Sequence, residues 1–221
     1  MSVVCVGAAI PDVETERYKL NGWTTSRNGH RGRKRSRRFI ANMRHSPGVS
    51  IGACCRSGAL ERMNDKVQRL RRDLTEAIAQ PNWPPGYRVR TFTANDAPTV
   101  YQLLDVGYAQ GGGHVGAFEE WWPSLRDDDQ FAADLCFLAV DERQNIVGVA
   151  QCWTSAFVKD LVVHPLARRR GIAEALLRTV FLEFRHRGEK HVDLKVQLDN
   201  PTGAVRLYKK LGMREVPLDG S

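Results

Sequence analysis

The chain has 221 residues and a formal net charge of +8, and this charge is concentrated near its beginning. Residues 1–62 hold 12 Lys and Arg against 4 Asp and Glu, whereas residues 63–221 hold 21 of each. The high isoelectric point therefore describes residues 1–62 and says nothing about what the rest of the chain binds. No stretch approaches the roughly 20 consecutive apolar residues that span a bilayer, so we expect no membrane-spanning helix.

The cysteines favour a reducing, cytoplasmic compartment and a protein that holds no metal. They show neither the spacing of metal ligands nor the even count of a disulfide framework: Cys5, Cys54, Cys55, Cys136 and Cys152. The last two lie in strand-like runs, where a buried free thiol is the usual state. Met1–Pro11 lacks a basic region, so we predict no secretory signal there.

Residues 1–62 show no sustained hydrophobic period, which predicts a basic, disordered extension. Six of the eight residues from Arg31 to Arg38 are cations, as in arms that bind nucleic acids, but no aromatic residues alternate with them to stack on bases. A third interpretation is that this segment is not translated, because Met63 stands directly before a helix-like pattern. These three interpretations stay open.

Residues 63–86 are predicted to form a helix and a linker that precede the main domain at 87–221. Met63–Ala79 has the spacing of an amphipathic helix, with its apolar face at Val67, Leu70, Leu74 and Ile78. Four of the six residues from Pro81 to Gly86 are proline or glycine, which predicts a break before the domain.

The first part of the domain is predicted to be a strand followed by two helices. Tyr87–Phe92 alternates as a strand, and Thr93–Asp96 is a capping sequence for a helix at Ala97–Ala109. Gly111–His114 follows a helix rather than a strand, so it is interpreted as a flexible loop, with a mobile lid as the alternative. Phe118–Leu125 is expected to be a short helix whose tryptophans either pack in the core or line a pocket.

A β-hairpin and a further strand are predicted next. Two apolar runs, Leu135–Val140 and Ile146–Trp153, flank a polar turn. Gly148, inside the second run, indicates a bulge or the close approach of another segment. Phe157–Val163 is the following strand, and Pro165 ends it by removing a ladder donor.

The segment after that strand is predicted to bind a pyrophosphate. Residues 168–173 read Arg-Arg-Arg-Gly-Ile-Ala, and helical spacing runs from Ile172 to Phe184. The first amides of a helix lack intrahelical partners and favour an anion, while Gly171 lets the backbone come close. The three arginines add fixed positive charge and forked donors. Taken alone, the segment also fits a solvated basic loop, and the order of the surrounding elements favours the anion site.

The remaining elements are a strand, a helix and at most a short last strand within 213–218. His191–Leu198 alternates strictly and follows a helical crossover, so it should run parallel to Phe157–Val163. Asn200 and Pro201 suit the N-cap and the first position of a helix. The apolar face of this helix is predicted to be Ala204, Leu207, Tyr208 and Leu211.

In this order of elements, the chain resembles the GCN5-related N-acetyltransferase (GNAT) superfamily over about residues 87–216. Two motifs carry the resemblance: R-x-x-G-x-A within Leu161–Leu177, and N-P-x-G-A-x-x-L-Y-x-x-L-G-M at Asn200–Met213. The resemblance implies an α/β fold (α+β): a mixed, mostly antiparallel sheet with helices on both faces and two central parallel strands splayed apart around acetyl-CoA. The residues that it assigns to this co-substrate are Leu161, Val162, Val163, Arg168, Arg169, Arg170, Gly171, Ile172, Ala173, Asn200 and Tyr208.

The activity that the resemblance implies is direct acetyl transfer from acetyl-CoA to a primary amine, either of a small molecule or of a protein. A backbone N–H near Val163 would serve the oxyanion, and Tyr208 would protonate the leaving thiolate, or else only pack in the core. Dimers are frequent in the family, so a homodimer is an expectation. Several members carry a glutamate where this chain has Phe157, so the base stays open between Asp160 and a water chain to Glu119 or Glu120.

Two alternatives belong to other classes of function. The missing glutamate is compatible with a non-catalytic module that binds acyl-CoA. The basic residues 1–62 are compatible with a nucleic-acid-associated protein, whose binding would weaken with salt and disappear when this segment is deleted.

Overall fold

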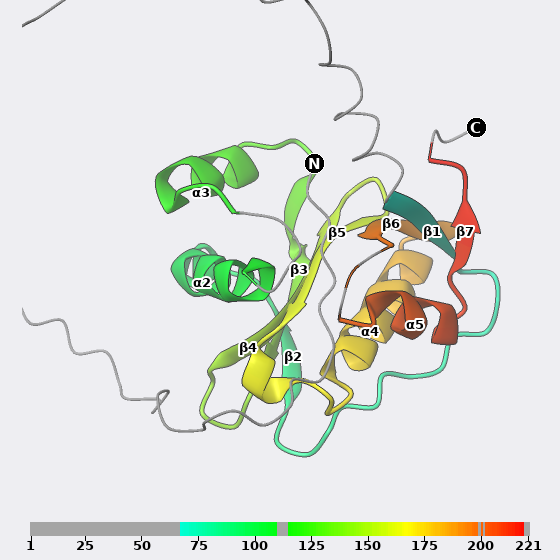
Figure 1. Ribbon diagram of the computed structural model, residues 1–221, viewed down its shortest axis with the longest axis horizontal. Coiled ribbons are helices and arrows are strands. Elements are labelled where there is room, and N and C mark those ends of the chain that lie inside the picture. Colours follow the sequence, from blue (N-terminus) through cyan, green and yellow to red (C-terminus); the bar gives the residue numbers. More distant parts are fainter. Residues whose placement is uncertain (1–66, 110–114, 199, 201, 219–221) are drawn as a thin grey trace, which may run out of the picture. The chain divides into compact units, whose positions relative to one another are not determined.

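The computed structural model describes residues 67–109, 115–198, 200 and 202–218. The interpretations of residues 1–62, of the Gly111–His114 loop and of Pro201 lie outside this part of the chain. Within it, a seven-stranded sheet carries helices on both faces (Figure 1). None of the described helices is long and apolar enough to cross a membrane.

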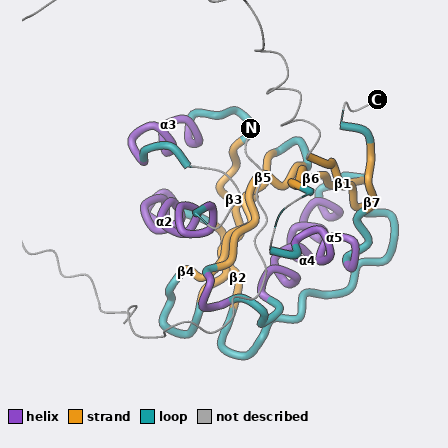
Figure 2. The backbone as a smooth tube through the Cα atoms, viewed as in Figure 1, coloured by secondary structure: helices purple, strands orange, loops and turns teal. Residues whose placement is uncertain are grey.

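The elements of the described residues follow in this order along the chain: β1 (Val67–Asp73), β2 (Arg88–Thr91), the 3-10 turn η1 (Ala94–Asp96), α2 (Ala97–Tyr108), α3 (Phe118–Arg126), β3 (Phe131–Val140), β4 (Ile146–Trp153), β5 (Phe157–Val163), the 3-10 turn η2 (Pro165–Ala167), α4 (Ile172–His186), β6 (His191–Gln197), α5 (Ala204–Lys210) and β7 (Arg214–Val216). In space the strands are ordered β2-β3-β4-β5-β6-β1-β7 (Figure 2). Neighbouring strands are antiparallel except β5 and β6, which are parallel. The predicted mixed, mostly antiparallel sheet is therefore confirmed.

The two faces of the sheet belong to two separate hydrophobic clusters. On one face α2 packs over β4 and β5, and on the other α4 lies against β3 to β6 (Figure 1). Successive residues of β5 alternate between them, because side chains of a strand point to opposite faces. Val162 joins the cluster under α2, whereas Leu161 and Val163 join the cluster under α4.

Gly148 shows both of the features predicted for it, a β-bulge and the close approach of another segment. Ala139 pairs with Gly148 while Val140 pairs with Ile146, so β4 carries one extra residue there, a β-bulge. A Cβ on Gly148 would also lie only 3.2 Å from Cδ1 of Leu176, so the missing side chain lets α4 approach the sheet.

The prediction of a helix over Met63–Ala79 is wrong, because residues 67–73 form β1. This strand lies between β6 and β7 and pairs antiparallel with both. Its buried face carries Gln68, Leu70 and Arg72, so polar side chains conceal the period of two, while the apolar residues happen to have helical spacing. The domain boundary at residue 87 is wrong for the same reason, since β1 is an inner strand of the domain's own sheet.

The two cysteines of the described residues, Cys136 and Cys152, are buried and free, as predicted. Burial raises the pKa of both thiols, so neither is a ready nucleophile. Within the described part of the chain, no three His, Cys, Asp or Glu side chains are grouped so that they could hold a metal ion.

Candidate functional site

β5 and β6 are joined at one end only. Phe157 pairs with Asp193 and Val158 with Leu194, and beyond Val158 no residue of β5 pairs with β6. The remaining edge of β5 therefore faces a gap rather than a neighbouring strand. The predicted pair of splayed parallel strands is confirmed.

A β-bulge in β5 lies at the point where the two strands separate. Along the pairing with β4, Val158 lies opposite Cys152 but Asp160 lies opposite Gln151, so Lys159 is the extra residue. A bulge changes which main-chain groups face each neighbour, because the alternation of a strand restarts after the extra residue.

After the bulge, Leu161 and Val163 turn their main-chain groups towards the gap. His164 follows β5 and donates its amide to the carbonyl oxygen of Val147 on β4 (2.8 Å). Because these groups alternate along an antiparallel strand, those of Val163 and Leu161 point away from β4, and those of Val162 point towards it. The open edge is thus suited to an extended ligand that pairs like an added strand.

Arg168 covers the end of this edge. Its Nε donates to the carbonyl oxygen of Val163 (2.9 Å), and its partly buried guanidinium has a pKa lowered from the ordinary value by burial. Arg168 is therefore a lining group of the gap rather than a freely solvated cation.

The turn between η2 and α4 bends sharply at the end of the gap. Both Arg169 (φ 62°) and Gly171 (φ 91°) have left-handed backbone, and Gly171 is the N-cap of α4. A Cβ on Gly171 would meet no atom within 4 Å, so this residue borders open space. The first amides of α4 belong to the same turn, which gives it the donors that anions prefer.

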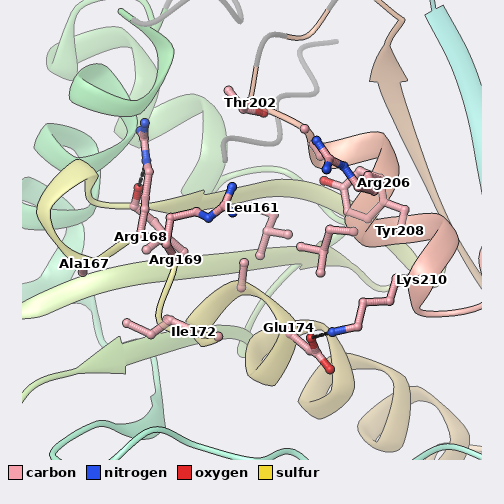
Figure 3. A pocket seen from close by; sticks show the side chains of 16 residues that line it. Leu161, Ala167, Arg168, Arg169, Ile172, Glu174, Thr202, Arg206, Tyr208 and Lys210 are labelled. Atoms are coloured by element: carbon pink, nitrogen blue, oxygen red, sulfur yellow. Dashed lines mark hydrogen bonds and ion pairs between the residues drawn. The ribbon is translucent and has the colours of Figure 1, made fainter. Parts of the chain in front are cut away.

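A groove of about 380 Å³ begins at this turn and lies between β5, α4 and α5. Its lining is apolar at Leu161 and Ile172, and Arg169 and Arg206 enter it from opposite sides (Figure 3). The groove therefore combines an apolar floor with cations contributed by two separate elements.

Most of the residues predicted to contact the co-substrate line this groove: Leu161, Val163, Arg168, Arg169, Gly171, Ile172, Ala173 and Tyr208. Arg170 points elsewhere. It donates from Nη1 to the hydroxyl of Tyr87 (2.7 Å), and its Cζ lies 6.0 Å from the centre of that ring. Arg170 borders a second cavity of about 340 Å³ together with Gly171, Glu174 and Lys210.

Asn200 is not the N-cap of the last helix, which begins at Ala204 with left-handed Gly203 (φ 73°) before it. Its Oδ1 instead accepts hydrogen bonds from the amide (2.9 Å) and the hydroxyl of Thr202. An Asn side chain readily closes such a local turn in place of a cap. Thr202 and Gly203, rather than Asn200, line the groove, and the sequence pattern did not indicate them.

Tyr208 is buried and lines the groove. Its side chain is 0% exposed, and its hydroxyl makes no hydrogen bond with any described residue. A buried hydroxyl without a partner costs about 1–3 kcal/mol, so such an atom is unusual unless a ligand or water completes it. The predicted packing role and the predicted functional role are thus both compatible with its position.

The sequence did not predict that α5 also lines the groove with Arg206, Leu207 and Lys210. Lys210 also forms an ion pair with Glu174 (2.7 Å), which joins α5 to α4 (Figure 3). The available signal was the i, i+4 spacing of the two cations on the helix that carries Tyr208.

The candidate bases lie away from the groove. Asp160 is 1% exposed and accepts hydrogen bonds from the hydroxyl of Tyr108 and from Nζ of Lys159 (2.6 Å). Tyr108 belongs to the cluster under α2, so Asp160 points to the face opposite the groove. Glu119 and Glu120 are exposed in the first turn of α3.

The two tryptophans of α3 pack against other rings, which supports the core interpretation. The ring centre of Trp121 lies 5.6 Å from that of Tyr101, and that of Trp122 lies 5.7 Å from that of Phe92. Both side chains keep part of their surface exposed.

Comparisons with known proteins agree with this geometry. Residues 98–213 match the model of the acetyltransferase (GNAT) family. An uncharacterised N-acetyltransferase of Methanocaldococcus jannaschii is 27% identical over 145 residues, which are 58% of this chain and 61% of the relative. A crystal structure of a GCN5-related N-acetyltransferase from Sphaerobacter thermophilus is 28% identical with a TM-score of 0.60, over 72% of this chain and 53% of that one.

A more distant structure shares the fold alone. The glucosamine N-acetyltransferase region of a fungal multi-domain β-N-acetylglucosaminidase is 11% identical with a TM-score of 0.51, over 72% of this chain and 21% of that one. The chain thus spans less than two thirds of the length of each of these three relatives.

Proposed function

Because the chain belongs to the GNAT family of acetyltransferases, we propose that it transfers an acetyl group from acetyl-CoA to an amine. The observation that carries the proposal is a single groove with two chemically different ends. At one end lie the main-chain groups of β5 that face the gap, and at the other lies the left-handed turn at the start of α4. A pantetheine arm has amides that suit the first end, and a diphosphate suits the second.

The groove fits the remaining features of acetyl-CoA. Its volume of about 380 Å³ lies within the range of small-molecule sites. The cations Arg169 and Arg206 complement phosphate charge, and forked guanidinium groups are well shaped for phosphate oxygens. The hydroxyl of Tyr208 is a buried polar atom that a bound ligand would satisfy.

Bound acetyl-CoA supplies a thioester for the amine to attack and a thiolate that leaves. In this chain, an N–H of β5 that faces the gap, as that of Val163 does, is the donor proposed for the developing oxyanion. Tyr208 is proposed to give its phenolic proton to the leaving sulfur. Three acids are candidates for taking the proton of the amine: Asp160 directly, or Glu119 and Glu120 through water.

The test combines binding with turnover. Calorimetry with acetyl-CoA should show saturable binding, and an assay for free CoA across a panel of amines should show release that depends on the amine. Binding without release for every amine would favour the non-catalytic acyl-CoA-binding module. Absence of binding would overturn the proposal.

A further inference from the structure

The sheet carries a concentration of positive charge on the face opposite the groove. Leu70 of β1 and Leu194 of β6 point into the cluster under α4, so the residues directly before and after each of them point to the other face. On that face β1 presents Arg69 and Arg71, and β6 presents Asp193 and Lys195. With the exception of Val67, the residues of β1 and β6 on this face are polar.

Asp193 neutralises only part of this charge. Its carboxylate accepts hydrogen bonds from Nε of Arg69 (3.0 Å) and from Nε of Arg71 (2.8 Å), and its side chain is only 4% exposed. Burial acts to raise the pKa of Asp193, but the hydrogen bonds from Arg71 and Arg69 outweigh it and hold the pKa below the usual value. The carboxylate is therefore one negative charge shared between two guanidinium groups.

Lys195 adds a positive charge that no described acidic side chain neutralises. It lies directly opposite Arg69 in the pairing of β1 with β6, and its ammonium forms no ion pair with any described residue. Like charges directly opposite each other destabilise a sheet. Departures from such local rules occur mostly at sites where function requires them.

The position of these side chains relates them to the proposed reaction. Asp193 pairs with Phe157, where β5 and β6 still touch, and Lys195 lies two residues further, where the strands have separated. The groove lies on the face of the sheet covered by α4 and α5, so a bound co-substrate leaves the opposite face as the route by which an acceptor reaches the gap. The cations border that route.

We propose that Arg69, Arg71 and Lys195 form a subsite for an anionic group, a carboxylate or a phosphate, carried by the acceptor amine. The inference rests on the proposed acetyl transfer and names the class of its acceptor. The positive charge attracts the anionic group and disfavours a protonated amine nearby, which keeps the nucleophile neutral. The same charge repels polycationic amines.

Replacing Lys195 distinguishes binding of an anionic ligand by these cations from a purely structural role in the sheet. The ion pairs of Arg69 and Arg71 with Asp193 join β1 to β6 and would serve stability without any ligand. Lys195 makes no such contact, so replacing it tests recognition with little disturbance of the sheet. Lys190, an exposed lysine in the turn before β6, provides a control with the same change of charge.

The experiment measures kcat/KM of the full chain for four acceptors of similar length: 4-aminobutyrate, 3-aminopropyl phosphate, 4-aminobutanamide and 1,4-diaminobutane. We expect at least one anionic acceptor to exceed the amide by about tenfold, as for one charge-assisted hydrogen bond, and the diamine to be the poorest. The comparison of carboxylate with phosphate tells which anion is preferred. In Lys195→Gln the preference should fall about tenfold, whereas Lys190→Gln should retain it.

A second measurement does not depend on turnover. NMR titration of the full chain, with and without CoA, compares N-acetyl-4-aminobutyrate with its amide and N-acetyl-3-aminopropyl phosphate with N-acetylpropylamine. At least one anion should bind about tenfold more tightly than its neutral partner, and Lys195→Gln should remove the difference. Equal affinities, or equal turnover of amide and acids, would overturn the subsite while leaving acetyl transfer intact. Failure of acetyl-CoA to bind would instead overturn the proposed function.

Discussion

Val158 and Leu194 are the last pair of residues that joins β5 to β6. The bulge at Lys159 follows at once, and after it the main chain of Leu161 and Val163 faces the gap. The gap therefore arises from two local features: the pairing of β5 with β6 ends, and the bulge changes which main-chain groups of β5 face β4. Both events place hydrogen-bonding groups at the edge of a groove that ends at Gly171.

Replacing Gly171 with glutamate should abolish the binding of acetyl-CoA. The left-handed backbone (φ 91°) strains any side chain at this position, and a carboxylate there would oppose the phosphates that the turn is proposed to hold. Calorimetry measures the affinity, and an unchanged affinity would remove the turn from the binding site.

Gly188→Glu is the matched control for that change. Gly188 has almost the same backbone angle (φ 87°), and a Cβ there would also meet no atom within 4 Å. It lies just after the other end of α4, outside the groove. The control variant should lose some stability but keep its affinity for acetyl-CoA, so that loss in both variants would point to misfolding instead.

Tyr208→Phe should lower turnover about a hundredfold while affinity for acetyl-CoA changes little, because a general acid acts on the leaving group. The free protein should not lose stability, since the hydroxyl removed is buried and has no partner among the described residues. Steady-state kinetics and urea unfolding check the two effects separately. Tyr101→Phe on α2 is the matched change away from the groove, and equal turnover in both variants would assign Tyr208 to packing alone.

The sequence predicted best those parts whose signals are local. The strand at Phe157–Val163, Gly171 at its turn and the helix from Ile172 were predicted to the residue, because β-branched runs, glycine and helical spacing act within a few positions. The separation of β5 from β6 followed from the family resemblance rather than from any pattern in the strands themselves.

The errors arose where distant partners decide the outcome. β1 became a strand because it pairs with β6 more than a hundred residues further along the chain, which overrides its helical spacing. The side chain of Arg170 is directed by Tyr87, 83 positions earlier, so its place outside the main groove was not readable from the turn. The prediction of Asn200 as an N-cap was wrong because its side chain accepts a hydrogen bond from the amide of Thr202 instead.

The inner position of β1 predicts that Leu70 is critical for stability. Leu70 is 0% exposed and packs in the cluster under α4, so Leu70→Ala should lower the free energy of unfolding by about 2–5 kcal/mol. Leu198→Ala removes the same atoms from a side chain that is 54% exposed and should cost less than about 0.5 kcal/mol. Urea unfolding measures both, and equal effects would contradict the placement of β1 inside the sheet.

The capping box of η1, the turn directly before α2, predicts a dependence of stability on pH. Asp96 accepts hydrogen bonds from Nη1 and Nη2 of Arg90 (2.7 Å each) and from the amide of Thr93 (2.8 Å). The hydrogen bonds from Arg90 are the largest cause that lowers the pKa of Asp96 to about 2, although burial opposes them. The unfolded chain has an ordinary carboxyl pKa of about 3.9, so the folded state binds this proton less readily than the unfolded state.

The stabilisation from Asp96 is therefore fully present above about pH 4 and is lost as the pH falls towards 2. Asp96→Asn should cost about 1 kcal/mol at pH 7, a value reduced by the solvent exposure of Arg90, and the difference from the parent should vanish near pH 2. Asp105→Asn, an exposed position of α2 outside the capping box of η1, controls for the loss of charge. Urea unfolding from pH 2 to 7 provides the measurement. A difference for Asp96→Asn that stays constant over this range would mean that its carboxylate does not stabilise the fold through Arg90, because only an ionised carboxylate can form that pair.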